Sequence, residues 1–354
     1  MISGPFPPPA APGRRMAAEI AEQPEVWERL LRGGQADVQA AVRRIREHRP
    51  RFVLFVARGT SDNAALYAKY LVEILVELPA GLVSPSTMTT YGARPDLTGV
   101  LMVGVSQSGG SPDLVHSMSL AREQGALTLA VTNAPGSPLA QAAELHVDVL
   151  AGPERAVAAT KSYTAQLLAL YLVVDGWRGG ACEGCDRLPG LGRRVLGNGE
   201  VVADLAERYR FATRLVTTAR GYSYATVCEA ALKLMETSYL SAQAFSGADL
   251  LHGPLAMIDP QVPVLAVMAS GVGGDAMGQV LAKLREVGAD LFVVGSPDAV
   301  AKATVGVELP AGVPEELSPL LEILPFQQLA RDLAIARGGD PDAPRGLEKV
   351  TETL

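Results

Sequence analysis

The chain has 354 residues, of which 48% are hydrophobic and 19% charged, and its formal net charge is −7. This composition excludes a disordered regulator, the acidic balance argues against a nucleic-acid partner, and no run of about 18 uncharged apolar residues indicates a membrane span. Three cysteines are too few for a disulfide framework, so we expect a cytoplasmic protein. The composition is ordinary for a globular α/β protein, and the length is sufficient for two domains.

The first half of the chain is predicted to alternate between helices and strands. Residues 1–15 are rich in proline and lack the apolar region of a signal peptide, so a flexible tail is expected. The spacing of apolar residues then predicts helices at 16–31, 36–49, 63–76, 113–124 and 157–177, and strands at 51–56, 81–84, 100–105, 127–131 and 145–150.

A loop of small polar residues follows the strand predicted at 100–105. Residues 106–111 have the sequence SQSGGS, whose serines and glutamine offer hydroxyl and amide groups, while the glycines can turn backbone N–H groups inward. Pro112 opens a helix, and a helix N-terminus favours an anion. The loop therefore fits a phosphate ester, although a turn without a ligand explains it about equally well. It is not a Walker loop, because GxxxxGK[ST] is absent.

Residues 179–199 differ from what precedes them. They are rich in glycine and show no usable periodicity, so we predict a linker between two halves. Cys182 and Cys185 lie inside it, and one CxxC pair without nearby histidines is at most half of a zinc site. We interpret the pair as incidental rather than as a redox or metal site.

The pattern of the first half is repeated after this linker. Residues 215–220 and the Gly-Tyr-Ser that follows mirror 52–58 and the Gly-Thr-Ser around Ser61. Strands predicted at 262–269 and 290–296 stand where the first half has 100–105 and 127–131. The fold class is therefore α/β, with two tandem, doubly wound, parallel-sheet domains of the flavodoxin-like three-layer type at 16–178 and 200–337. Residues 270–274 (SGVGG) lack the dense hydroxyls of the first loop, so only the first loop is expected to bind phosphate.

The helix predicted after Gly221 places three charged residues on one face. Glu229, Lys233 and Glu236 stand at i, i+4 and i+7 among apolar neighbours. A solvated salt-bridge stripe is the simpler interpretation, but the apolar surroundings weaken it. His252, which precedes Gly253-Pro254 at a predicted helix end, is a further candidate.

Five motifs occur in a characteristic order: SQSGGS, AGPERAVAATK, EAALKLMETSY, LLHGPLAMI and PRGLEK. Together they resemble the sugar-isomerase (SIS) family, and in particular the isomerase half of glucosamine-6-phosphate synthase, from about Met16 to Leu354. The glutaminase domain of that enzyme is not found in the sequence. The chain is therefore expected to resemble the stand-alone double-SIS deaminases and deglycases that act on amino-sugar 6-phosphates.

The resemblance implies a site for a sugar phosphate. The residues that match the family's binding positions are Thr60, Ser61, Ser106, Gln107, Ser108, Ser111, Val157 and Ala159. Enediol chemistry also requires a carboxyl group whose pKa is raised towards neutrality by burial, and a proton donor at the ring oxygen.

The resemblance also implies catalytic roles. Glu236 would move a proton between C1 and C2, with Glu229 and Lys233 in support. His252 would open the sugar ring in the neighbouring subunit's site, which implies a homodimer. Lys349 would form a Schiff base with the open-chain ketose. It lies in a tail at 338–354, which is expected to be flexible until substrate binds. No metal and no organic cofactor is implied.

Three departures from the family pattern leave the substrate open. Ala159 stands where the family has a serine, Gly110 replaces an acidic residue, and Glu348 precedes the lysine where the family has a small residue. We expect an isomerase and deaminase that converts glucosamine 6-phosphate to fructose 6-phosphate and ammonia. The alternatives are an aminotransferase-like isomerase domain, a fructosamine-6-phosphate deglycase and a catalytically silent sensor that binds a sugar phosphate.

Overall fold

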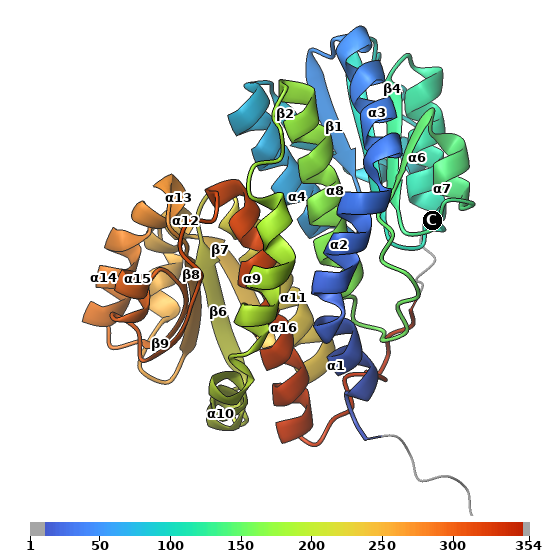
Figure 1. Ribbon diagram of the computed structural model, residues 1–354. Helices are drawn as coiled ribbons and strands as arrows, with labels where there is room; N and C mark the ends of the chain where they lie inside the picture. Colours follow the sequence, from blue (N-terminus) through green and yellow to red (C-terminus); the bar gives the residue numbers. More distant parts are fainter. Residues whose placement is uncertain (1–10, 350–354) are drawn as a thin grey trace, which may run out of the picture.

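Two five-stranded parallel sheets form the frame of the protein (Figure 1). The computed structural model describes residues 11–349. The first sheet has the order β2-β1-β3-β4-β5 and the second has the order β10-β9-β8-β6-β7. When the strands of the second half are counted from its own start, the two orders are the same. The predicted α/β fold of two tandem doubly wound domains is therefore confirmed.

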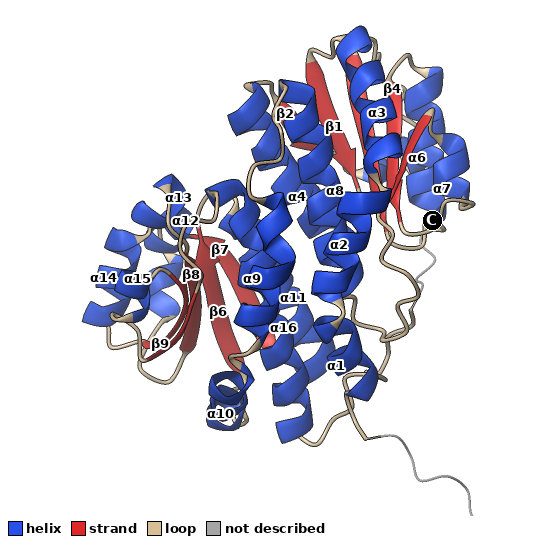
Figure 2. Cartoon of the chain, in the orientation of Figure 1, coloured by secondary structure: helices blue, strands red, loops and turns tan. Residues whose placement is uncertain are grey.

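The strands are short, and most of them are buried because helices cover both faces of each sheet (Figure 2). Their bounds are β1 Phe52–Val56, β2 Ala80–Leu82, β3 Val100–Ser106, β4 Leu127–Thr132, β5 Leu145–Asp148, β6 Arg214–Ala219, β7 Ser241–Ser246, β8 Pro263–Met268, β9 Asp290–Gly295 and β10 Val305–Glu308. The sequence analysis missed β7. It is an edge strand of mostly small and polar residues, SAQAFS, and has no apolar run that would reveal it.

The helices of the first half are α1 Arg14–Ala21, α2 Gln23–Gly33, α3 Gln35–His48, α4 Thr60–Leu71 with a π turn at Val72–Val76, α5 Pro85–Thr89, α6 Pro112–Glu123, α7 Pro138–Ala142 and α8 Lys161–Arg178. Those of the second half are α9 Leu188–Leu196, α10 Gly199–Tyr209, α11 Ser223–Ser238, α12 Gly247–Leu251, α13 Val272–Asp275, α14 Gly278–Glu286, α15 Pro297–Val300 and α16 Ser318–Ala336, with 3-10 turns at Cys185–Arg187, Pro254–Met257 and Glu315–Leu317.

The segment predicted to be a linker is largely structured. Helix α9 lies inside residues 179–199 and packs against α2 and α16. The sequence analysis missed this helix because it contains two glycines. Packing requires one of them, since a Cβ at Gly192 would lie 2.5 Å from the ring of Trp27. Cys182 and Cys185 form a disulfide, so the interpretation of the pair as incidental is wrong. The turn between them allows the sulfurs to meet.

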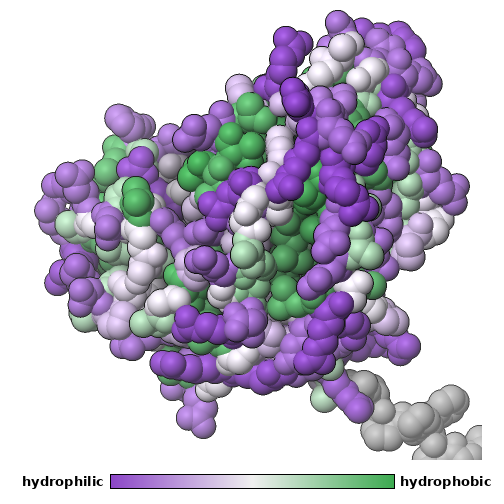
Figure 3. Space-filling view, turned by 45° about the horizontal axis from the view of Figure 1, so that its top comes forward, coloured by the Kyte–Doolittle hydropathy of each residue, from purple (hydrophilic) through white to green (hydrophobic). Residues whose placement is uncertain are grey.

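The two halves share one apolar core. Buried side chains of α4 and α8 from the first half form a single cluster with those of α11 and α16 from the second. Glu229 on α11 also accepts a hydrogen bond from Asn63 on α4, so polar contacts cross the boundary as well. In Figure 3 hydrophilic residues form most of the visible surface, with hydrophobic groups between them. Within residues 11–349, no helix has the length and apolar character needed to cross a membrane.

Candidate active site

The loop after β3, residues 106–111, forms a tight turn, called the cradle below, whose polar side chains line a pocket. The hydroxyl of Ser106 accepts a hydrogen bond from the backbone N–H of Gly109 at 3.1 Å, and Ser108 accepts one from Gly110 at 3.3 Å. Gly109 has φ 62°, and a Cβ there would lie 2.1 Å from Ser137 Oγ, so no other residue fits. Helix α6 begins at Pro112 directly after the loop, as predicted.

A pocket of about 340 Å³ opens at this loop. It is lined by Arg58, Gly59, Thr60, Ser61, Ser106, Gln107, Ser108, Ser111, Leu114, Val157, Ala159, Ser162, Lys233, Glu236, Leu347, Glu348 and Lys349. All eight residues predicted to bind the sugar phosphate are among them. The volume suits a small molecule rather than a polymer.

Helix α11 contributes a buried lysine and a pocket-facing carboxylate. Lys233 is 1% exposed, and its Nζ donates hydrogen bonds to Thr60 Oγ1 at 2.9 Å and to Glu236 Oε2 at 2.5 Å. Burial lowers the pKa of Lys233, but the neighbouring carboxylates of Glu229 and Glu236 outweigh it, and the net shift is upward. A charged lysine therefore fixes the Glu236 carboxylate, which is 22% exposed and lines the pocket.

Glu229 lies behind this pair and does not line the pocket. It is fully buried, accepts hydrogen bonds from Thr60 Oγ1 at 3.1 Å and Asn63 Nδ2 at 2.8 Å, and lies 3.4 Å from Lys233 Nζ. Burial raises the pKa of Glu229 to about 7. The carboxyl group predicted to have a raised pKa is thus Glu229, which was expected to support Glu236. Glu229 is fully buried, whereas Glu236 is 22% exposed.

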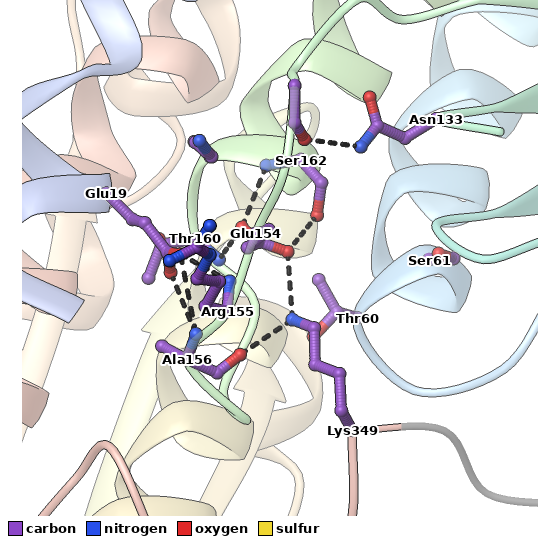
Figure 4. Close-up of polar contacts among 12 residues, drawn as sticks. Glu19, Thr60, Ser61, Asn133, Glu154, Arg155, Ala156, Thr160, Ser162 and Lys349 are labelled. Carbon is purple, nitrogen blue, oxygen red and sulfur yellow. Dashed lines mark hydrogen bonds and ion pairs between the residues drawn. The ribbon is translucent and has the colours of Figure 1, made fainter. Parts of the chain in front are cut away.

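Lys349 enters the pocket from the C-terminal tail (Figure 4). Its Nζ donates hydrogen bonds to the carbonyl of Ala156 at 2.7 Å and to Glu154 Oε2 at 3.2 Å. Burial raises the pKa of Glu154, but Lys349 and three donors from Thr160 and Ser162 outweigh it and lower the pKa. Glu154 is therefore a buried anion that holds the tail lysine.

The tail before Lys349 is anchored, which differs from the predicted flexibility. Asp340 accepts a hydrogen bond from the backbone of Gly13 at 3.0 Å, and Asp342 accepts two at 2.8 Å from the first turn of α1. Arg345 stacks on the ring of Tyr239 at 4.1 Å. The composition of residues 338–346 predicted mobility, but its two aspartates satisfy the free N–H groups of a helix start.

The end of the tail predicted at residues 1–15 is also ordered, because it binds the same two aspartates. Gly13 and Arg15 donate hydrogen bonds to these aspartates, and helix α1 begins at Arg14. Residues 1–10 lie outside the described part of the chain, as do residues 350–354 of the predicted C-terminal tail.

The second half fills its equivalent loop with its own carboxylate. Glu315 accepts hydrogen bonds from the backbone N–H groups of Val272 at 2.8 Å and Gly273 at 2.7 Å. A Cβ at Gly271 would lie 2.3 Å from Glu315 Oε2, so the glycine makes room for this contact. Ser223, the counterpart of Ser61, donates to the buried carboxyl of Glu322. In the second half, Glu315 and Glu322 thus accept hydrogen bonds from the groups whose counterparts in the first half line the pocket.

His252 does not reach this pocket. It is exposed at the C-terminus of α12 and does not line the pocket that holds Glu236. Within residues 11–349 there is no group of three or more histidine, cysteine, aspartate or glutamate side chains that could hold a metal ion.

Several pocket residues were not assigned a role from the sequence. Arg58 pairs with the buried Asp113 at 2.8 Å, and Ser162 donates to Glu154 at 2.6 Å. Glu154 was visible as one acid within the AGPERAVAATK motif, in a run of small apolar residues. An acid in such a run indicates a buried, paired carboxylate, and this signal could have identified it.

Comparisons with known proteins agree with this description. A family model described as SIS domain matches residues 48–175 and 209–337. The glutamine–fructose-6-phosphate aminotransferase (isomerizing) of Thermococcus kodakarensis is 34% identical over 347 residues, which cover 94% of this chain and 57% of that protein. The chain thus spans somewhat more than half the length of the curated relatives it matches.

Solved structures are also similar over nearly the whole chain. The C-terminal domain of glucosamine-fructose-6-phosphate aminotransferase from Francisella tularensis superposes with a TM-score of 0.85 at 26% identity, covering 94% of this chain and 99% of that one. A candidate phosphosugar isomerase of Silicibacter pomeroyi has a TM-score of 0.83 at 34% identity, covering 92% and 99%.

Proposed function

The chain belongs to the SIS-domain family and is homologous to the isomerase half of glutamine–fructose-6-phosphate aminotransferase, and from this we propose that it is an isomerase of amino-sugar 6-phosphates. It would interconvert the 2-imino form of a ketose 6-phosphate and a 2-amino aldose 6-phosphate by moving a proton between C1 and C2. This aminotransferase-like isomerase is favoured over the deaminase expected from the sequence, since the relatives that support it match at 34% identity.

One observation carries the proposal: the cradle and a carboxylate paired with a lysine line the same small pocket. The loop at residues 106–111 offers the hydroxyl groups of Ser106, Ser108 and Ser111 and the amide of Gln107 to a phosphate, and the N–H groups of Gly109 and Gly110 hold two of these hydroxyls in place. Glu236 presents an oxygen to the same space, where a proton on a carbon next to a carbonyl or imine can be taken and returned. Holding the phosphate fixes C1 and C2 relative to that oxygen.

The supporting groups fit a base of this kind. Lys233 donates to Glu236, so one carboxylate oxygen is held while the other remains available for a proton. Thr60 links Lys233 to Glu229, and this buried network prevents the carboxylate from rotating away. Lys349 places an amine in the pocket that could form an imine with the open-chain ketose.

Ammonia release is a second candidate, favoured by that amine. An imine between Lys349 and C2 can replace the nitrogen that C2 carries, and hydrolysis then gives the ketose phosphate. A deglycase for phosphorylated fructosamines uses similar proton chemistry, and the departures Ala159 and Glu348 both line the pocket where they could alter specificity.

The test measures both reactions in one assay. Purified protein is incubated with glucosamine 6-phosphate, or with fructose 6-phosphate and ammonium, and the sugar phosphates and ammonia are quantified. Proton exchange at C1 and C2 in deuterated water, lost in Glu236→Gln and retained in Glu308→Gln on the edge strand β10, supports the isomerase. Absence of exchange with every 6-phosphate tried would contradict it, and release of an amine only from substituted fructosamines would favour the deglycase.

A further inference from the structure

The Nζ atom of Lys349 occupies a position that the rest of the chain forms for it. Glu154, fully buried, and the carbonyl of Ala156 are its two acceptors. The other hydrogen bonds of Glu154 come from the start of α8 and the residue before it: Thr160 N at 2.9 Å, Ser162 N at 3.1 Å and Ser162 Oγ at 2.6 Å. These donors belong to the body of the protein and not to the tail that carries Lys349.

Helix α1 fixes the second acceptor. The carboxylate of Glu19 accepts hydrogen bonds from the backbone N–H groups of Arg155 and of Ala156, the latter at 3.2 Å. These bonds fix the two peptide groups that precede the Ala156 carbonyl, which accepts from Lys349. The charged groups around the position are therefore Glu154, Glu19 and Lys349, with Lys233 within electrostatic range of Glu154.

Reaction at Lys349 removes the cation from this position. When Nζ becomes bonded to C2 of a sugar, it must move from between its two acceptors towards the substrate. A fully buried carboxylate that loses its counter-charge is strongly destabilising. Glu154 then needs another small cation that can donate hydrogen bonds to the same two oxygens.

We propose that the position formed by Glu154 and the Ala156 carbonyl is an ammonium-binding site, which Lys349 fills at rest and which ammonium released from C2 of the substrate fills when Lys349 forms its imine. This inference rests on the proposed function for its substrate, but the site itself consists of residues whose contacts are described above.

The exchange balances in atoms and charge. Nζ of Lys349 starts as an ammonium and first gives a proton to its acceptor Glu154. The free amine then attacks the protonated imine C2=NH2⁺, and Glu154 returns the proton to the departing nitrogen. The C2–Nζ bond forms, the bond from C2 to its original nitrogen breaks, and the products are C2=NH⁺–Lys349 and NH4⁺. No electron transfer and no further reactant is needed, and the reverse reaction loads nitrogen onto C2.

The test uses the full chain without any sugar. In Lys349→Met the position should be open, so ammonium chloride should raise Tm by a few degrees relative to tetramethylammonium chloride or sodium chloride at equal ionic strength. The increase should saturate with ammonium concentration and disappear in Lys349→Met combined with Glu154→Gln. Lys161→Met is the matched control. Lys161 is 2% exposed and lies 2.6 Å from Glu22, but that carboxylate is 38% exposed and can be solvated by water.

Equal Tm values for folded Lys349→Met in the three salts would overturn the proposal, as would the same ammonium effect in Lys161→Met. If the double variant does not fold, the comparison of salts and controls still decides the question. Because no sugar is present, this result is independent of the isomerase assay. A failed activity assay with a positive salt effect would therefore reject the proposed function and keep the site.

Discussion

The carboxylate of Glu315 lies 2.7 Å from the backbone nitrogen of Gly273, in the loop of the second half that corresponds to residues 106–111 of the first. The fold was duplicated, and the pocket that Glu236 and Lys349 line opens at the loop of the first copy. The other copy is closed by an anion from the same chain. This asymmetry and the geometry of the pocket lead to four predictions.

Sugar phosphate should bind only to the first cradle. Ser108→Ala removes a hydroxyl that lines the pocket and should weaken binding of fructose 6-phosphate by about 1.5–3 kcal/mol, since hydrogen bonds to charged groups are of this size. Ser270→Ala, at the equivalent loop, is the matched control and should leave Kd unchanged in calorimetry. Crystals soaked with the ligand should show density at residues 106–111. Density at residues 270–274 instead would contradict the assignment.

Lys349 should be the residue that forms a Schiff base. Treatment with borohydride in the presence of fructose 6-phosphate should add the reduced sugar to Lys349, because its amine lines the same pocket as the phosphate loop. Peptide mass spectrometry identifies the modified residue. Lys69, held in an ion pair with Glu73 at 2.8 Å, is an internal reference that should stay unmodified. Modification at Lys233 or elsewhere in place of Lys349 would refute the role.

A homodimer with shared active sites is predicted from the family resemblance, in which His252 acts in the neighbouring subunit's site. In its own chain His252 is exposed and does not line the pocket. Glu236→Ala and His252→Ala should each be inactive. Mixing the two variants and allowing subunits to exchange should restore up to about a quarter of the sites' activity, because a mixed dimer retains one intact site. Verified exchange without any recovery would count against a shared site.

Stability should depend on pH through Glu322. Burial raises the pKa of this carboxyl to about 7, above its unfolded value near 4.5, although Ser318, Thr226 and Ser223 donate hydrogen bonds to it. The folded state therefore binds more protons between these two values. The stabilisation from this group is complete below about pH 4.5 and is lost as the pH rises through 7.

Urea unfolding of Glu322→Gln measures this contribution. The free energy of unfolding of the wild type relative to the variant should fall between pH 5 and pH 8 by at most about 3 kcal/mol, the upper limit for a shift of this size. Glu200→Gln, at an exposed position of α10, should show no such difference. A pH-independent difference between wild type and Glu322→Gln would show that the carboxyl does not titrate in this range.

The sequence by itself determined the features that are local. The duplication, most of the strands and the Ser/Gly loop after residues 100–105 follow from periodicity and from glycine and serine at fixed places, and these depend on neighbours within a few residues. Glu229, Lys233 and Glu236 could be placed on one face because helical spacing alone sets that relation. The resemblance to a family then assigned roles to single positions.

Only the tertiary structure decided which groups meet across long stretches of chain. Lys349 contacts Glu154 across 195 residues, and residues 13–16 contact Asp340 and Asp342 across more than 320. Packing also decides which carboxylate of α11 is buried. Helix α4 covers Glu229, whereas Glu236 faces the pocket, and burial therefore raises the pKa of Glu229. Such contacts depend on how helices and strands pack against one another. The hydrophobic pattern of a helix or strand predicts which of its faces is buried, but it does not predict which distant polar residues that helix or strand contacts.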